Sequence, residues 1–411
     1  MLQFRPHIIL LFAALLVLTG CREHAMRKYD PSTIDFQVQY NEALDGCLYP
    51  SLILGVAGLK DPMPQESALF AVSVTSPASG SILRITVDSS RLNYVTIIQE
   101  ELPERGKTYT FYPRLKWKYE ALYATRQSGL MDLTFTCFIN DEQVDVRNLR
   151  LNYRSANECL ISIRTPDNHH YDFRWLFAGY VNEEHPYIDS ILTDILDQRI
   201  VTRFVGYQQG EKAVSEQVFA FWYYALQRGI SYSSITCTSN PSKRTNVQRI
   251  RFFDEVYNSR QANCVDACVF FASLFRKVGL KPVIFVEPCH AYLGYYTDRN
   301  RKKIALLETT VTSWVNFPEL DRNLDANGRL PDKYYLKVKR FLSEKDQKRY
   351  ADGKMGYEEM KHAVARTLFT KATEYNQSNY ASNKLHFADT SNVAYQQLDV
   401  EQLRRIVQPI N

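Results

Sequence analysis

The spacing of apolar residues changes near Thr165, and this change divides the chain into two regions that must fold differently. Before it, β-branched and aromatic residues form short segments, which Pro, Gly, Ser and Asp clusters separate. Five such segments are predicted strands: 68–75, 81–87, 94–98, 108–112 and 133–139. Short strands with regular turn signals predict an antiparallel, Ig-like β-sandwich over residues 36–156.

After this point the apolar residues recur at helical spacing. Helices are predicted at 188–196, 214–226, 263–278 and 357–375, with Gly279 ending the third of them. Between the last two helices, residues 281–286 read as a strand, and 291–296 with 303–310 read as a hairpin. This order predicts a second domain over residues 157–411, with an α+β fold and an antiparallel sheet. A length of 411 residues suits two domains.

The N-terminus is predicted to be a targeting segment. Residues 8–18 are an apolar run preceded by Arg5, and the run is shorter than the ~20 residues that a transmembrane helix needs. The Leu18-Thr-Gly-Cys21 sequence that follows resembles a bacterial lipoprotein signal. On that reading residues 1–20 are removed, lipid on Cys21 anchors the protein to a membrane, and residues 21–35 form a tether. The alternative is a generic signal peptide that happens to end near a cysteine.

Charge and cysteine content narrow the classes of function. Lys and Arg total 50 against 45 Asp and Glu, and this small excess gives no support for nucleic-acid binding. If Cys21 carries lipid, seven of the eight cysteines remain, and an odd number leaves at least one thiol free in an exported protein. Disulfides among Cys47, Cys137, Cys159 and Cys237 are permitted in that compartment.

Three residues of the second domain form a candidate catalytic group. Cys264 falls in the first turn of the helix predicted at 263–278, where free backbone N–H groups and the helix dipole favour a thiolate. A nucleophilic cysteine needs a base, and the base needs an orienting acceptor. His290 at the start of the predicted hairpin and Glu308 on its returning strand can lie side by side. The pattern predicts a Cys264, His290 and Glu308 triad.

The sequence around these residues resembles the transglutaminase-like superfamily, in particular its bacterial lipoprotein branch. The resemblance rests on Val247-Gln-Arg-Ile-Arg251, Ala262-Asn-Cys-Val-Asp266, Phe271-Ala-Ser-Leu-Phe275, Gly279-Leu-Lys-Pro282, Cys289-His-Ala-Tyr-Leu-Gly294 and Leu307-Glu-Thr-Thr310. It implies a papain-like α+β core with Cys264 as the nucleophile, His290 as the base and Glu308 as the orienting acid. Ala262 and Cys289 depart from the family, since relatives usually have glycine there. A site that needed glycine's conformational freedom would be distorted by these residues.

Two further assignments concern the surroundings of Cys264. An oxyanion needs donors, and the candidates are the Cys264 backbone N–H and the Gln248 side chain. A zinc site of Cys264, Cys268, Cys289 and His290 is the less favoured alternative, because adjacent residues on a strand point to opposite faces. We therefore expect no metal and no cofactor.

These observations predict a membrane-anchored thiol hydrolase of the cell envelope, facing the periplasm or the cell surface. It would be a cysteine peptidase or amidase that forms an acyl-thioester with peptide or protein substrates. Transfer to an amine is less favoured, because no acceptor pocket has a signature in the sequence. The alternatives are a catalytically inactive binding protein and a purely structural envelope lipoprotein.

Overall fold

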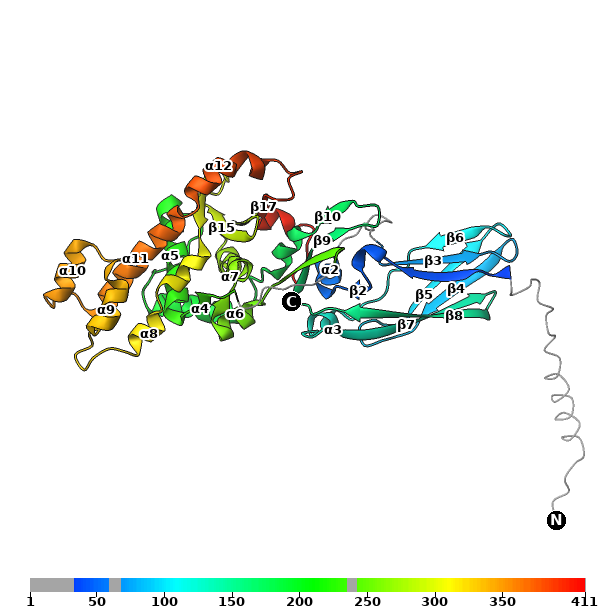
Figure 1. Cartoon of the computed structure of the whole chain (residues 1–411), viewed down its shortest axis with the longest axis horizontal. Helices are drawn as coiled ribbons and strands as arrows, with labels where there is room; N and C mark the ends of the chain where they lie inside the picture. The colour runs from blue at the N-terminus through cyan, green and yellow to red at the C-terminus, as the bar shows by residue number, and fades with distance from the viewer. Residues whose placement is uncertain (1–32, 59–67, 235–241, 411) are drawn as a thin grey trace, which may run out of the picture.

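The computed structural model of the chain describes residues 33–58, 68–234 and 242–410. The predicted signal peptide, Cys21 and most of the predicted tether lie outside the described residues, as does Cys237. The described chain has a mixed α+β fold with several antiparallel sheets, as predicted. One half of the molecule consists mostly of strands, and the other combines most of the helices with a further sheet (Figure 1).

The first region contains two sheets. One has three strands in the order β1 (Phe36–Tyr40), β3 (Phe70–Thr75) and β6 (Thr108–Phe111). The other has five in the order β2 (Cys47–Leu48), β8 (Glu142–Tyr153), β7 (Gly129–Ile139), β4 (Ser81–Val87) and β5 (Thr96–Leu102). All pairs are antiparallel except β2 with β8. Three short helices accompany the sheets: η2 (Glu42–Leu44), α2 (Pro50–Gly55) and α3 (Tyr119–Tyr123).

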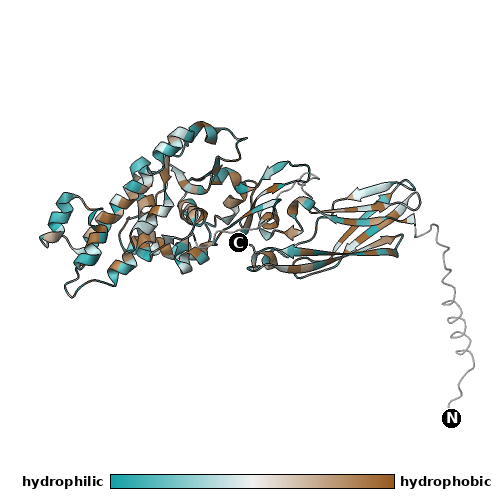
Figure 2. Ribbon diagram, viewed as in Figure 1, coloured by the Kyte–Doolittle hydropathy of each residue, from teal (hydrophilic) through white to brown (hydrophobic). Residues whose placement is uncertain are grey.

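Alternating side chains explain why these sheets have a buried face. Along β3 and β4 every second residue is buried, and Figure 2 shows apolar and polar residues alternating along the strands. Phe70 of one sheet lies against Phe135 of the other, with ring centroids 5.8 Å apart. The apolar faces of the two sheets therefore contribute to one core.

The longest strand of this region, β8, is not among the predicted strands. Half of its residues are exposed and only two are buried, so its sequence lacks the apolar alternation that marks a half-buried strand. Pairing with β7 along its whole length holds it in the sheet. The connecting residues Asn140 and Asp141 both have positive φ angles, 48° and 67°, as a two-residue type I′ hairpin turn requires.

The second region combines helices with a four-stranded antiparallel sheet. The sheet order is β16 (Ile304–Leu307), β15 (His290–Tyr296), β14 (Pro282–Glu287) and β17 (Gln396–Asp399). The helices are α4 (Pro186–Asp197), α5 (Gly210–Arg228), α6 (Phe253–Ser259), α7 (Cys264–Lys277), α8 (Phe317–Asp321), α9 (Asp332–Lys339), α10 (Glu344–Ala351), α11 (Tyr357–Glu374), α12 (Gln377–Ala388) and α13 (Val400–Leu403). Two 3₁₀ helices, η4 (Arg174–Tyr180) and η5 (Thr309–Trp314), complete it.

Helix α7 is central to this region. It contacts β14 and β15 as well as α5 and α6, and residues 265–275 of it are buried. Gly279 follows its last turn with a φ angle of 79°, in agreement with the predicted helix end. The helix therefore holds Cys264 rigidly at its N-terminal end.

The two regions share a continuous core at their junction. There β9 (Glu158–Arg164) pairs with β10 (His170–Asp172) and β12 (Thr245–Arg249). A separate pair, β11 (Ser231–Tyr232) with β13 (Gln261–Ala262), lies within the second region. Helix α2 of the first region contacts β9, and the Gly55 carbonyl accepts a hydrogen bond from the Gln408 N–H at 2.9 Å. The C-terminus accordingly lies between the two halves in Figure 1. Packing thus continues across the predicted domain boundary at residues 156 and 157.

Within the described residues, no helix combines the length and the apolar character needed to cross a bilayer.

Candidate functional site

The first turn of α7 presents Cys264 in a half-buried position. Asn263 precedes the helix as its N-cap, and its Oδ1 accepts a hydrogen bond from the Asp266 N–H at 2.8 Å. Asp266 returns the bond by accepting from the Asn263 N–H at 2.9 Å, which completes a capping box. These two bonds fix the turn that carries Cys264, so the thiol sits beside the free N–H groups at the start of the helix.

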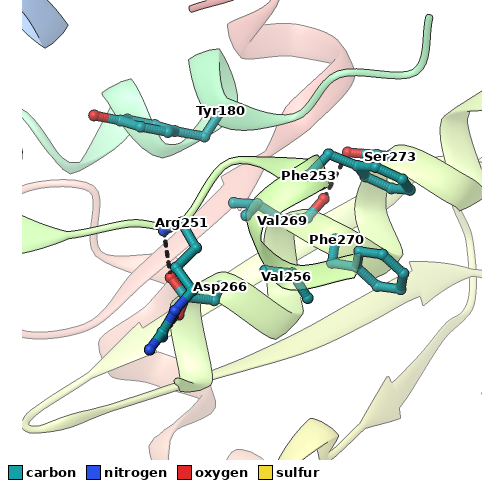
Figure 3. Close-up of a pocket in the computed structure, with 8 residues that line it drawn as sticks. All are labelled: Tyr180, Arg251, Phe253, Val256, Asp266, Val269, Phe270 and Ser273. Carbon is teal, nitrogen blue, oxygen red and sulfur yellow. Dashed lines mark hydrogen bonds and ion pairs between the residues drawn. The ribbon is translucent and has the colours of Figure 1, made fainter. Parts of the chain in front are cut away.

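A buried ion pair ties this turn to the preceding strand. Arg251 follows β12, and its Nη1 lies 2.6 Å from Oδ2 of Asp266, which is fully buried. The Arg251 backbone N–H donates to Oδ1 of the same carboxylate at 2.8 Å (Figure 3). The small cavity beside the pair has no room for a water molecule, so this part of the structure positions Cys264 rather than binding a ligand.

His290 links Cys264 to Glu308. Its Nε2 lies 2.8 Å from Oε2 of Glu308, and Cys264 is near enough to the ring to help raise the pKa of His290. Since Nε2 is occupied by the carboxylate, Nδ1 is the nitrogen that remains for the sulfur. The His290 side chain is 28% exposed, whereas Glu308 is completely buried. The structure therefore brings the three predicted residues together in the predicted order.

Glu308 lies at a different place in the fold from the one predicted. Strand β16 ends at Leu307, which pairs with Leu293, so Glu308 is not on the returning strand of the hairpin. It is instead the N-cap of η5 and accepts from the Thr310 N–H at 3.0 Å. The predicted strand runs three residues too far because Thr309 and Thr310 have β-branched side chains.

Every hydrogen-bonding position around the Glu308 carboxylate is occupied. Oε1 accepts from the N–H and the hydroxyl of Thr310, while Oε2 accepts from His290 and from Nδ2 of Asn376 at 2.7 Å. Burial raises the pKa of Glu308, but the hydrogen bond and charge of His290 and the bonds from Thr310 outweigh it and lower the pKa below its usual value. The carboxylate is thus held in its ionised form.

The surroundings of His290 favour its protonated form. Burial lowers the pKa of this imidazole, but its interactions with Cys264 and with the Glu308 carboxylate outweigh burial and raise the pKa to about 10. At neutral pH a positive imidazolium therefore lies between the sulfur and the buried carboxylate.

The protonation of His290 can be measured directly. In an NMR titration with isotope-labelled histidine, we expect His290 to be an imidazolium at a pH of about 8. His185 and His362 should be neutral in the same spectrum, because burial lowers the pKa of each. A histidine in an unfolded chain has a pKa of about 6.5. The stability that the protonated ring contributes is therefore fully present below about pH 6.5 and is lost as the pH rises through about 10. A neutral His290 ring at pH 8 would contradict this description of the site.

Asn376 is a site residue that the sequence did not predict. It is buried, and it lies directly before α12 and 68 positions after Glu308. Its side-chain N–H donor completes the carboxylate's set of hydrogen bonds, so it fixes Glu308 in the orientation that His290 requires. Nothing in the local sequence connects it with the hairpin, because the contact depends on how α11 and α12 return to the sheet.

Replacing Asn376 with Asp should destabilise the fold in a pH-dependent way. A second carboxylate beside Glu308 raises the pKa of the pair, and we expect the free energy of unfolding at pH 8 to fall by about 1–3 kcal/mol. This loss should shrink as the pH falls towards 4, where one carboxyl group is protonated. Chemical denaturation at both pH values measures it, and Gln377→Glu is the control because it adds the same charge at an exposed neighbouring position. Equal losses in the two variants would contradict the role of Asn376.

Gln248 lies close to the turn that carries Cys264. Its Nε2 donates to the Arg249 carbonyl at 2.9 Å, and the same carbonyl accepts from Nδ2 of Asn263 at 3.2 Å. One carbonyl oxygen thus separates the Gln248 amide from the residue before Cys264. The amide has a second N–H that this bond does not use.

The other cysteines near the site have distinct environments. Cys289 is exposed and adopts a φ angle of 64°, the left-handed conformation that favours glycine, whereas Ala262 does not have a positive φ angle. Having cysteine rather than glycine at position 289 therefore leaves the turn between β14 and β15 intact. Cys268 is fully buried, and burial raises the pKa of its thiol well above the usual value. Among the residues that the structure describes, no three Cys, His, Asp or Glu side chains are grouped as a metal site requires.

All six cysteines in the described ranges are free, including Cys47, Cys137 and Cys159. Comparison of the chain with known protein families and with curated proteins finds no match.

Proposed function

We propose that the protein is a membrane-anchored thiol hydrolase of the transglutaminase-like type, a cysteine peptidase or amidase acting outside the cytoplasm. The observation that carries this proposal is the grouping of Cys264 and His290 with the buried Glu308 carboxylate: His290 hydrogen-bonds to Glu308 at 2.8 Å and interacts electrostatically with Cys264. A nucleophile, a base and an orienting acid in this order are the parts that acyl transfer needs.

The proposed reaction starts from a Cys264 thiolate and a His290 imidazolium. The sulfur attacks the carbonyl carbon of a peptide or carboxamide bond, and the N–H of Cys264 and the amide of Gln248 donate to the oxyanion. As the C–N bond breaks, His290 gives its proton to the leaving amine and Cys264 retains the acyl group as a thioester. Water then loses a proton to His290, and its oxygen attacks the thioester carbon. This step releases a carboxylic acid and restores the thiolate.

The proposal extends to the rest of the chain. The α7 helix against an antiparallel sheet is compatible with a papain-like domain, and the two apolar-faced sheets of the first region with a β-sandwich. In this proposal the sandwich is a docking module, and lipid on Cys21 holds the protein at a membrane facing the periplasm or the cell surface. The substrates would be peptides or the peptide parts of envelope polymers.

A peptide mixture of diverse sequence tests the activity across many candidate substrates at once. The wild-type protein is incubated with the mixture in the presence and absence of a primary amine, and mass spectrometry follows the products. We expect peptide cleavage, or conversion of Gln to Glu, that requires Cys264, and little incorporation of the amine. Dominant incorporation of the amine would identify a transferase instead. Identical products from the wild type and Cys264→Ala would favour a binding or structural protein and overturn the proposal.

A further inference from the structure

A pocket of about 400 Å³ is lined in part by η5 and α11, the elements next to Glu308. Its lining residues are Trp314, Arg340, Phe341 and Lys371. The rings of Trp314 and Phe341 are stacked with centroids 6.4 Å apart, and the Arg340 guanidinium lies 4.7 Å from the Phe341 ring centroid. The pocket thus combines aromatic walls with two cationic groups, and its volume lies within the range of small-ligand sites.

The two cations of the pocket have no acidic partner among the described residues. Neither Arg340 nor Lys371 forms an ion pair there, although neighbouring cations do: Lys337 with Glu319, Arg349 with Glu359, and Lys361 with Asp321. Two unneutralised positive charges beside a concave aromatic surface attract an anion that also carries apolar groups. An arginine can bind a carboxylate through two parallel hydrogen bonds.

The pocket is built on the same elements that hold Glu308. Trp314 ends η5, the helix that Glu308 caps, so about 12 Å of 3₁₀ helix separates them at ~2 Å per residue. Lys371 directly precedes Ala372, whose carbonyl accepts from the Glu308 N–H at 2.8 Å. Tyr375, which contacts Trp314 edge-on at 6.2 Å, directly precedes Asn376. The pocket and the acid of the triad are therefore carried by the same two elements, η5 and α11 with the residues that follow it.

We propose that this pocket is a substrate subsite for a carboxylate-bearing side chain or chain end of a peptide. The carboxylate lies between Arg340 and Lys371, and the aliphatic part of the side chain packs on Trp314. The proposal rests on the proposed function, since it names the substrate class of the same site: an acidic peptide. The apolar walls favour such a group over a small, fully hydrated anion, which would gain nothing from them.

A binding assay in the full-length Cys264→Ala protein tests this subsite without turnover. The probes are a fluorescein-labelled Ala-Glu-Ala-Glu peptide and its Ala-Gln-Ala-Gln counterpart, followed by fluorescence anisotropy. We expect the Glu peptide to bind about tenfold or more tightly, and Arg340→Gln with Lys371→Gln to remove this preference. The matched control is Lys345→Gln with Lys348→Gln, which removes the same charge from exposed residues of α10 and should leave the preference intact.

Three results would overturn the subsite: equal binding of both peptides, a preference that survives the pocket substitutions, or an equal loss in the α10 control. The assay is separate from any test of the thiol. If the Glu peptide is preferred but Cys264 is unreactive, the proposed subsite stands and the proposed enzymatic function is rejected. If Cys264 is reactive but neither peptide is preferred, the proposed function stands and the subsite is rejected.

Discussion

Replacing His290 with Ala should slow the Cys264-dependent hydrolysis by about 10⁴-fold or more. The imidazole both stabilises the thiolate and supplies the proton that the leaving amine needs, so its removal affects two steps. Because His290 and Cys264 act as one unit, the double variant His290→Ala with Cys264→Ala should be about as slow as either single variant. The measurement is kcat/KM on a peptide that the wild type cleaves.

A histidine outside the site provides the control for this prediction. His386 lies on α12, stacked on Tyr395 with ring centroids 5.1 Å apart, and it has no contact with the triad residues. His386→Ala should retain the wild-type rate. A His290→Ala protein that keeps more than about a tenth of the wild-type kcat/KM would show that the imidazole is not the base.

Replacing Asp266 with Ala should lower the free energy of unfolding by about 3–5 kcal/mol. The substitution leaves the Arg251 guanidinium buried without its partner and removes half of the capping box at Asn263. Chemical denaturation monitored by circular dichroism measures the loss. The double variant Arg251→Met with Asp266→Ala should cost less than the two single substitutions added together, since it leaves no charge unpaired.

A surface ion pair with similar geometry is the control. Asp132 likewise receives two hydrogen bonds from one arginine, here both from the Arg150 guanidinium at 2.7 Å and 3.1 Å, but both side chains are mostly exposed. Asp132→Ala should change stability only slightly, because solvent screens an exposed pair. Equal effects at Asp132 and Asp266 would mean that the buried pair does not hold the Cys264 turn.

Local signals made the start of α7 predictable. A cap, an apolar periodicity and a terminal glycine all lie within one segment, and the predicted helix over 263–278 differs from the observed Cys264–Lys277 by one residue at each end. The association of Cys264, His290 and Glu308 was also predictable. The predicted reason is partly wrong, because Glu308 reaches His290 from a helix cap rather than from a paired strand.

Other features depend on contacts that no local pattern records. Strand β8 is held by its neighbour β7, and its own sequence is too polar to mark it as a strand. Asn376 reaches Glu308 only after the chain has passed through α8–α11. The conformation of Cys289 opposes its residue type, since a positive φ angle favours glycine, and the surrounding hairpin imposes it.

Site-resolved alkylation of the thiols tests the central claim most directly. The folded protein is treated with iodoacetamide at a pH of about 6, well below the pKa of about 8.5 of an ordinary thiol, and labelling is followed peptide by peptide. We predict that half-buried Cys264 reacts faster than exposed Cys289, and that His290→Ala removes this difference. Labelling of Cys264 at or below the rate of Cys289 in the wild type would contradict a thiolate held by His290.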